Sequence, residues 1–145
     1  MFTHEYFMKE AIREAQKAFD KEEIPIGAVI VCNDIIIAKG HNLTQTLSDV
    51  TAHAEMQAIT SSSAYLGGKY LDQCTLYVTI EPCPMCAAAL YWAHLRELVY
   101  GANDIKNGFS LFKPLLLHPK TKVVKGIFQE ISVQLMKDFF SKKRS

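Results

Sequence analysis

A small set of residues in the middle of the chain has the types and spacing of a zinc site. His53 is followed two residues later by Glu55, and further along Cys83 and Cys86 form a C-x-x-C pair with Pro82 before the first cysteine. One imidazole and two thiolates are ligands that Zn²⁺ prefers, and this donor set favours zinc strongly over magnesium or calcium. The Glu55 carboxyl lies close to the imidazole in sequence without being needed as a ligand. The pattern predicts a zinc centre.

The two halves of this pattern are predicted to lie at the starts of two helices. Pro84 follows Cys83 at the point where the first helical residue tolerates proline, so Cys83 is expected to be the N-cap and Cys86 to lie in the first turn. Unpaired amides there favour negative charge and keep both sulfurs as thiolates. Residues 51–66 also have a helical pattern, with Thr51 as the expected N-cap. Two helix starts should therefore converge on one ion.

The number of ligands indicates catalysis rather than a structural role. Structural zinc sites usually have four protein ligands, whereas catalytic sites keep three and leave one position to water. The other two cysteines, Cys32 and Cys74, stand in apolar strand-like runs with no other ligand type beside them, and we find no fourth ligand in the sequence. Glu55 can then take a proton from water and pass it to a substrate. The sequence predicts a zinc hydrolase with Glu55 as base and acid in turn.

Length and composition place this pattern in a globular protein. The chain has 145 residues, of which 49% are hydrophobic, so a single domain over residues 1–145 is expected. It has no apolar run long enough to cross a membrane, and its N-terminus lacks the apolar block of a signal peptide, so we expect a cytoplasmic protein. Four cysteines in such a chain are better explained as metal ligands and buried thiols than as a disulfide framework.

The charge is distributed unevenly along the chain. Residues 1–119 hold nine Lys or Arg against thirteen Asp or Glu, whereas residues 120–145 hold seven against two. A basic tail is most often a solvated helix end, but it also suits contact with the phosphates of a nucleic acid. Both interpretations stay open from charge alone.

The apolar patterning predicts alternating helices and strands. We expect helices over residues 4–20 and 128–143 in addition to the two at the metal site, and strands over residues 27–32, 35–38, 74–79, 97–101 and 121–126. The first two strands should pair through an Asn33-Asp34 turn. Helices between the later strands imply crossovers, so the expected fold is α/β, in three α/β/α layers with a mixed five-stranded sheet. The third strand leads directly to Cys83, which puts the metal beyond a strand end, where open sheets bind ligands.

The motifs together resemble a known family. H-x-E followed by P-C-x-x-C is the signature of zinc nucleobase deaminases, and the chain resembles the cytidine deaminase superfamily. It is most similar to the bacterial tRNA-specific adenosine deaminases, which convert the wobble adenosine to inosine. The likeness rests on His4-Glu5-Tyr6, Ile24-Pro25-Ile26-Gly27-Ala28-Val29, Gly40-His41-Asn42, Thr51-Ala52-His53-Ala54-Glu55, Leu76-Tyr77-Val78-Thr79, Glu81-Pro82-Cys83, Gly101-Ala102, His118-Pro119 and Asp138-Phe139-Phe140.

The resemblance implies a cytidine deaminase-like fold, one zinc ion per subunit on the three ligands named above, and proton transfer by Glu55. It also implies that Asn42 and Ala54 help to hold the base. The implied partners are a tRNA anticodon stem-loop and a second copy of the chain in a homodimer.

Three further residues are predicted to contact RNA. Asp104 and Lys106 align with a loop that approaches the anticodon in the family, and a carboxylate there can accept a hydrogen bond from a ribose 2′-hydroxyl. An ordinary solvated loop is the alternative. Phe139 fits the apolar stripe of the last helix, which leaves Phe140 to stack near a splayed base.

Two other functions stay open. Pro84-Met85-Cys86 and Tyr91-Trp92-Ala93 resemble the guanine deaminases, and residues 107–117 are short for a tRNA enzyme. A free nucleobase deaminase, acting on guanine or cytosine, is therefore the alternative. A non-enzymatic zinc-stabilised subunit is the third hypothesis, and Glu55 argues against it because such a subunit needs the ligands but no proton shuttle.

Overall fold

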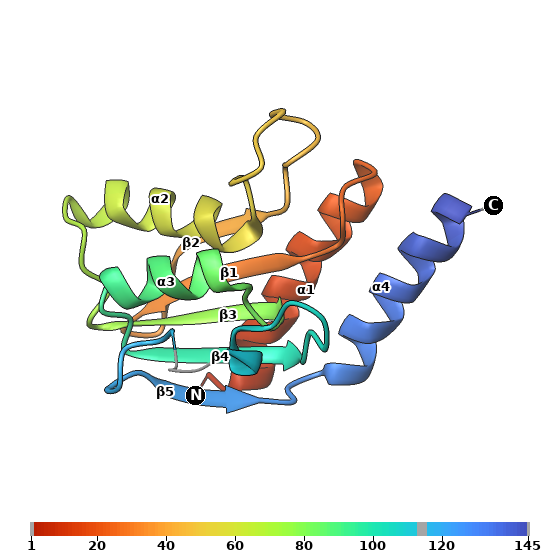
Figure 1. The fold of residues 1–145 in the computed structure, drawn as a ribbon. Coiled ribbons are helices and arrows are strands. Elements are labelled where there is room, and N and C mark those ends of the chain that lie inside the picture. Colours follow the sequence, from red (N-terminus) through yellow and green to blue (C-terminus); the bar gives the residue numbers. More distant parts are fainter. Residues whose placement is uncertain (1, 113–115, 145) are drawn as a thin grey trace.

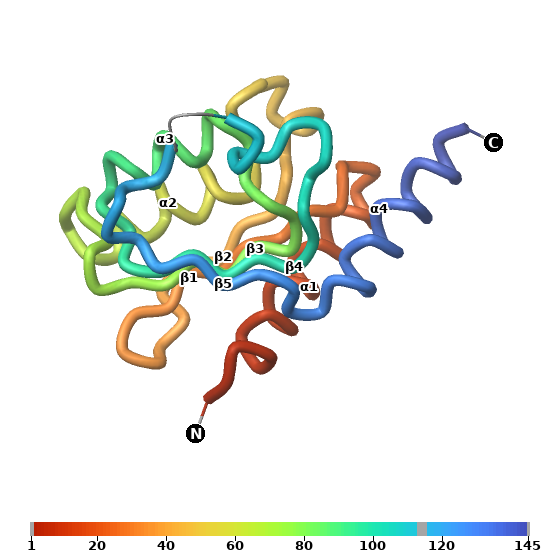
Figure 2. The backbone as a smooth tube through the Cα atoms, turned by 60° about the horizontal axis from the view of Figure 1, so that its bottom comes forward, coloured from red at the N-terminus to blue at the C-terminus, as the bar shows by residue number. Residues whose placement is uncertain are grey.

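The computed structural model describes residues 2–112 and 116–144 and shows a five-stranded sheet between two layers of helices (Figure 1; Figure 2). The strands are β1 (Gly27–Cys32), β2 (Ile35–His41), β3 (Cys74–Ile80), β4 (Glu97–Ala102) and β5 (Lys122–Lys125). They lie in the order β2-β1-β3-β4-β5, with β1 antiparallel to both neighbours and the last three strands parallel. The mixed sheet of the predicted α/β/α fold is confirmed.

Each face of the sheet carries two helices. Helices α1 (His4–Asp20) and α4 (Gln129–Arg144) pack on one face, and α2 (Ala54–Leu66) and α3 (Pro84–Trp92) pack on the other. A short 3₁₀ helix, η1 (Phe109–Leu111), lies between β4 and β5 and was not predicted. In the described part of the chain, no helix combines the length and the apolar character needed to cross a membrane.

Alternation along β3 divides the core into two layers. Leu76 and Val78 are fully buried against α2 and α3, whereas Tyr77 between them packs with Phe7 of α1 on the opposite face. Successive strand side chains point to opposite faces, so a continuous apolar run is what a strand covered on both sides requires. Strand β3 is therefore packed on both faces, and the chain continues from its end to Cys83 at the metal site.

The predicted Asn33-Asp34 hairpin forms without a glycine. Both residues have positive φ, 52° and 61°, as the two central positions of a type I′ turn require. Asn and Asp tolerate this left-handed conformation better than other residues, because their short side chains hydrogen-bond locally. Strand β2 then continues to His41, three residues beyond the predicted end.

The predicted N-cap of α2 is wrong by two residues. Thr51 is not the N-cap, because its hydroxyl donates to Asp49 Oδ1 at 2.7 Å and its backbone N–H donates to the same oxygen at 2.8 Å. Because residues 49–51 form this turn, the helix begins later, at Ala54, and His53 is its N-cap with an extended backbone. Gly40 of β2 lies against this first turn, where a Cβ would stand 2.6 Å from the Ala54 carbonyl oxygen. The close contact brings the start of α2 down onto the sheet.

Candidate active site

The three predicted ligands come together at the N-termini of α2 and α3. His53 is the N-cap of α2, Cys83 is the N-cap of α3, and Pro84 occupies the first turn after it, as predicted. His53 Nδ1 lies 3.6 Å from Cys83 Sγ and 3.4 Å from Cys86 Sγ. The His53 side chain makes no cap hydrogen bond to its own helix, and the Cys83 sulfur accepts from the Cys86 thiol, so both side chains face the other ligands.

These separations fit a zinc ion. Zinc–sulfur bonds of about 2.3 Å and zinc–nitrogen bonds of about 2.0 Å, meeting at tetrahedral angles, place N and S about 3.5 Å apart. The three ligand atoms lie within 4.8 Å of one another, and no fourth His, Cys, Asp or Glu joins the group among residues 2–112 and 116–144. The donor set is therefore that of a three-ligand centre with one position left for water or substrate.

The three ligand side chains share protons, and only Cys83, not both cysteines as expected, has the lowered pKa of a thiolate. A hydrogen bond from the Cys86 thiol, opposed by burial and reinforced by His53, lowers the pKa of Cys83 to about 4. The pKa of Cys86 is raised, chiefly because its thiol donates to Cys83. The hydrogen bond with Cys83 also raises the pKa of His53. Metal binding replaces these shared protons, so zinc affinity should depend on pH.

Glu55 lies in the first turn of α2 and is 4% exposed. Burial is the main cause that raises its pKa to about 7. Glu55 interacts with all three ligand residues but is not part of the metal-binding group, which contains only His53, Cys83 and Cys86. A buried carboxyl in this position can both accept and donate a proton.

Asn42 and Ala54 are the two residues predicted to hold the base. Both line a cavity that also contains the ligands His53 and Cys83 in its wall. Asn42 is buried at the end of β2, where its backbone N–H donates to Ile26 and its side-chain N–H donates to Glu23 and Thr44, each at 3.4 Å. Both side-chain contacts use the amide nitrogen, which leaves the amide oxygen to act as an acceptor for a ligand. Ala54, the first residue of α2, brings a buried small side chain and a helix N-terminus to the wall.

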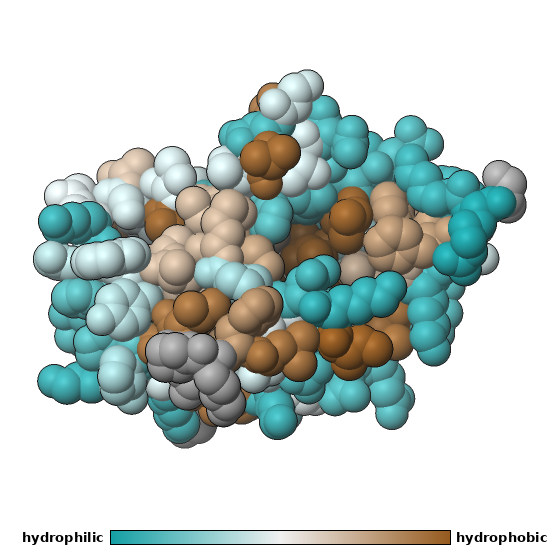
Figure 3. Space-filling view, viewed as in Figure 1, coloured by the Kyte–Doolittle hydropathy of each residue, from teal (hydrophilic) through white to brown (hydrophobic). Residues whose placement is uncertain are grey.

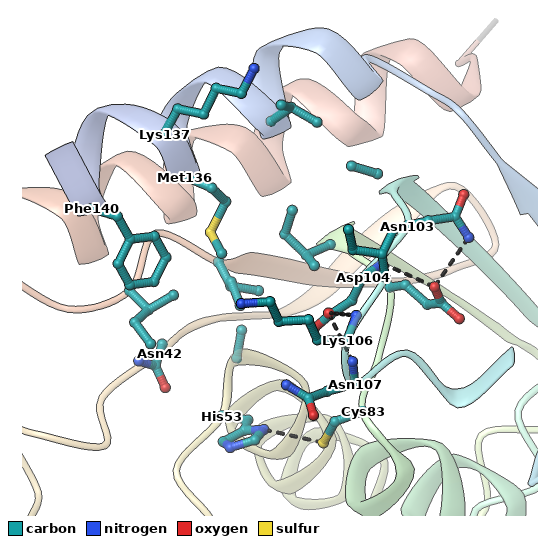
Figure 4. Close-up of a pocket in the computed structure, with 18 of the residues that line it drawn as sticks. Asn42, His53, Cys83, Asn103, Asp104, Lys106, Asn107, Met136, Lys137 and Phe140 are labelled. Atoms are coloured by element: carbon teal, nitrogen blue, oxygen red, sulfur yellow. Dashed lines mark hydrogen bonds between the residues drawn. The ribbon is translucent and has the colours of Figure 1, made fainter. Parts of the chain in front are cut away.

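Asp104 and Lys106 lie on the opposite wall, in the segment after β4 (Figure 4). Asp104 Oδ1 accepts from the backbone N–H groups of Lys106 and Asn107, at 3.0 Å each. One oxygen of Asp104 therefore shapes its own loop. The 107–117 segment is described for residues 107–112 and 116–117, and the remainder of that prediction lies outside the described residues.

Helix α4 forms the far side of the cavity and separates its two phenylalanines. Phe139 is 6% exposed and packs on Phe19 of α1, whereas Phe140 is 40% exposed and lines the cavity. Met136, Lys137 and Arg144 line the same side. The cavity measures about 1470 Å³, and Figure 3 shows hydrophobic side chains in the hollow beside α4 with hydrophilic ones along its borders. We call it the groove.

Sequence reasoning missed the contacts of two buried carboxylates, Glu23 and Glu81. Glu23 accepts hydrogen bonds from Gln45 N and from both the N–H and the hydroxyl of Thr46. Glu81 accepts hydrogen bonds from three residues of the 103–110 segment. Each partner is about twenty or more residues away, so no local pattern reveals the contacts. The one signal in the sequence is that Glu81 stands two residues before the ligand Cys83.

Comparisons with known proteins agree with this geometry. The family model described as the cytidine and deoxycytidylate deaminase zinc-binding region matches residues 1–102. The tRNA-specific adenosine deaminase of Aquifex aeolicus (strain VF5) is 42% identical, over 97% of this chain and 96% of its own length.

Two solved structures are also similar. A structure from work on A-to-I editing by tRNA:A34 deaminases at the wobble position of transfer RNA has a TM-score of 0.84 and 40% identity, covering 90% of this chain and 98% of its own. The guanine deaminase of Bacillus subtilis has a TM-score of 0.67 and 44% identity, covering 70% of this chain and 66% of its own. The first likeness extends over more of both chains.

Proposed function

Because the chain belongs to the cytidine and deoxycytidylate deaminase family, we propose that it is a zinc-dependent tRNA adenosine deaminase that hydrolyses the wobble adenosine of an anticodon to inosine. The observation that carries this proposal is the extent of the groove. Pockets for small ligands usually enclose about 300–1,000 Å³. A cavity of about 1470 Å³ that continues from the metal ligands along α4 suits a base presented on a polynucleotide.

The zinc ion would be held by His53, Cys83 and Cys86, and when bound it would lower the pKa of a water molecule and so make it a better nucleophile. Glu55 accepts a proton from the attacking water and passes it to the ring nitrogen of adenine. It then takes the remaining proton from the hydroxyl added at C6 and delivers it to the departing amino group. The C6–N bond breaks and a carbonyl forms, so that adenosine and water give inosine and ammonia. Burial beside the ligands keeps Glu55 within reach of both proton transfers.

The remaining site residues bind and orient. The amide oxygen of Asn42 accepts a hydrogen bond from the base, and Ala54 leaves room for its ring. Phe140 offers an exposed aromatic face for stacking, a contact worth about 1–3 kcal/mol per base in single-stranded recognition. Asp104 and Lys106 meet the ribose and phosphates of the anticodon loop.

We further propose that the single 145-residue domain works as a homodimer. An aromatic surface lies near the C-terminal ends of α2 and α3, away from the groove. Trp92 is 74% exposed beside Tyr91, Tyr91 contacts His118, and Tyr70 stacks on His94 with ring centroids 4.7 Å apart. Exposed aromatic groups gathered in this way are typical of protein interfaces. Since tRNA is its substrate, the enzyme would act in the cytoplasm.

The test is to offer the purified zinc-loaded protein an adenosine-34 anticodon stem-loop RNA, a matched RNA with guanosine at position 34, and the free bases guanine and cytosine. We expect ammonia release and inosine from the first RNA alone.

Size-exclusion chromatography with light scattering gives the oligomeric state, with Trp92→Ala as the interface variant. A protein that remained monomeric at all concentrations would overturn the homodimer.

Deamination of a free base is the second candidate. The likeness to the guanine deaminase of Bacillus subtilis favours it, because the identity over the aligned part, 44%, is comparable with the 40% found for the tRNA:A34 deaminase structure. Turnover of guanine or cytosine with the RNA untouched would establish this alternative and would contradict the tRNA proposal.

A further inference from the structure

Glu81 is a buried carboxylate beside the metal centre that the proposed chemistry does not use. It stands two residues before Cys83 and is 3% exposed. Its Oε1 accepts from Asp104 N at 3.0 Å and from Asn103 Nδ2 at 3.1 Å, and its Oε2 accepts from Ser110 N at 2.9 Å. A buried carboxylate needs such donors, because an unpaired one would be strongly destabilising. These three donors come from a single segment, residues 103–110.

That segment folds directly over the carboxylate. A Cβ on Gly108 would stand 2.3 Å from Glu81 Oε1, closer than any real contact, although the φ of Gly108 is −65° and suits any residue. The glycine is therefore required by space and not by backbone conformation. Gly108 N–H donates to Asp104 O at 2.9 Å, which closes the turn around Glu81.

Both ends of the segment are fastened to residues 81 and 82. Glu81 N–H donates to Ala102 O at 2.8 Å, and Phe109 N–H donates to Pro82 O at 2.9 Å. Between these attachments, Asp104, Lys106 and Asn107 point to the groove opposite α4 (Figure 4). The stretch that ends in a zinc ligand thus also carries one wall of the groove.

We propose that Glu81 is a positioning residue that holds the 103–107 segment in the shape that contacts RNA beside the metal centre. This inference rests on the proposed function. Loss of Glu81 leaves the backbone N–H groups of Asp104 and Ser110 without this acceptor, and Asn103 Nδ2 keeps only its bond to the Tyr100 hydroxyl at 3.1 Å. The segment should therefore loosen while the ligands stay in place. The expected defect is in RNA binding and KM, with a smaller change in kcat.

The experiment is a double-mutant cycle of Glu81→Ala and Gly108→Ala, with Gly68→Ala as the matched glycine control. A Cβ on Gly68 would meet no heavy atom within 4 Å, and Gly68 has no positive φ, so alanine there should change nothing. We expect each test variant to raise KM for the stem-loop RNA, and its Kd in fluorescence anisotropy, about tenfold or more. In the double variant the removed carboxylate leaves room for the new methyl group, so the two effects should not add.

Two readouts separate positioning from general damage. Zinc content should stay at one per chain, and hydrogen–deuterium exchange should rise in residues 102–110 but not in β3 or α2. Glu81→Gln, which keeps one oxygen, should lie between wild type and Glu81→Ala.

Three results would overturn the inference: an unchanged KM and Kd in both single variants, fully additive effects, or zinc loss and global exchange in parallel with activity. A wild-type protein that does not deaminate the RNA would instead refute the proposed function. In that case the exchange and zinc measurements still decide whether Glu81 holds the segment.

Discussion

At the scale of single residues, the proposed function assigns metal binding and proton transfer to different side chains. Glu55 lies beside the ligands and is not one of them. Glu55→Gln should therefore retain zinc and the fold but lose a factor of about 10² or more in kcat, as removal of a general acid–base usually does. Deamination assays with metal analysis on the same preparation check this. A variant that turned over at nearly the wild-type rate would disprove the assigned role.

The cysteines fall into two groups: Cys83 and Cys86 belong to the metal-binding group, and Cys32 does not. Cys86→Ser replaces a thiolate by a poor zinc ligand, so the chain should lose zinc and unfold at a lower temperature, because metal binding adds to the free energy of folding. Cys32→Ser is the matched control, since Cys32 lies half-buried in β1 away from the ligands. Metal content and calorimetric melting temperature measure both. Equal zinc content in the two variants would contradict the ligand assignment.

The residues found from sequence and those missed differ in how far their partners lie along the chain. His53, Cys83 and Cys86 were predictable because metal chemistry restricts residue type and spacing within short motifs. Glu81 was not, because its role depends on donors more than twenty residues later in sequence. A glutamate has the same local pattern whether it is solvated or buried, so only the fold distinguishes the two.

At the scale of elements, the start of a helix depends on whether the expected capping side chain is free or already bonded elsewhere. Helix α1 was predicted to its observed ends because its apolar stripe is regular and Thr3 caps it, accepting from Tyr6 N at 3.1 Å. Thr51 has the same residue type before α2, but Asp49 takes its hydroxyl and backbone N–H. The local preference for a threonine N-cap is the same before both helices. Before α2, the turn between Asp49 and Thr51 moves the N-cap to His53.

Helix α4 places two adjacent aromatic residues in different surroundings. Phe139→Ala empties a buried position and should destabilise the fold by about 3–5 kcal/mol. Phe140→Ala should leave stability nearly unchanged but weaken RNA turnover, because its exposed ring lines the groove. Urea denaturation and RNA kinetics on the pair separate the two roles. Loss of stability from Phe140→Ala with RNA turnover intact would contradict this assignment.

The loop after β2 is held by Glu23, which is 1% exposed. Burial raises the pKa of Glu23, but hydrogen bonds from Thr46 and Gln45 outweigh it, so the pKa falls below its ordinary value of 4.5. A carboxyl with a lowered folded-state pKa stabilises the protein above its unfolded-state pKa, and that stability is lost as pH falls through the folded-state value.

Glu23→Gln should therefore lower the free energy of unfolding by about 1–3 kcal/mol at neutral pH and by less at acid pH. Urea denaturation of both proteins at pH 7 and near pH 3 measures the difference. Glu22→Gln, at the exposed neighbouring position, is the control and should show no effect at either pH. A difference for Glu23→Gln that did not shrink on acidification would mean that its charge contributes nothing.

At the scale of the whole molecule, charge and groove coincide. The formal net charge is only +1, yet residues 120–145 hold seven Lys or Arg against two Asp or Glu, and α4 carries Lys137 and Arg144 along the groove. Sequence alone left open whether this basic tail is simply solvated. The structure places α4 across the groove from the metal ligands, where the phosphates flanking a bound base would pass.

RNA turnover should accordingly fall as salt rises, because each lysine or arginine that meets a phosphate releases a counterion. The slope of log(kcat/KM) against log[salt] should be negative, and Lys137→Gln with Arg144→Gln should reduce its magnitude by about 0.7 for each lost contact with single-stranded RNA. Lys69→Gln is the matched control, since Lys69 follows the end of α2 that points away from the metal centre. An equal slope in all three proteins would place the phosphates elsewhere, and turnover independent of salt would favour an uncharged free base as the substrate.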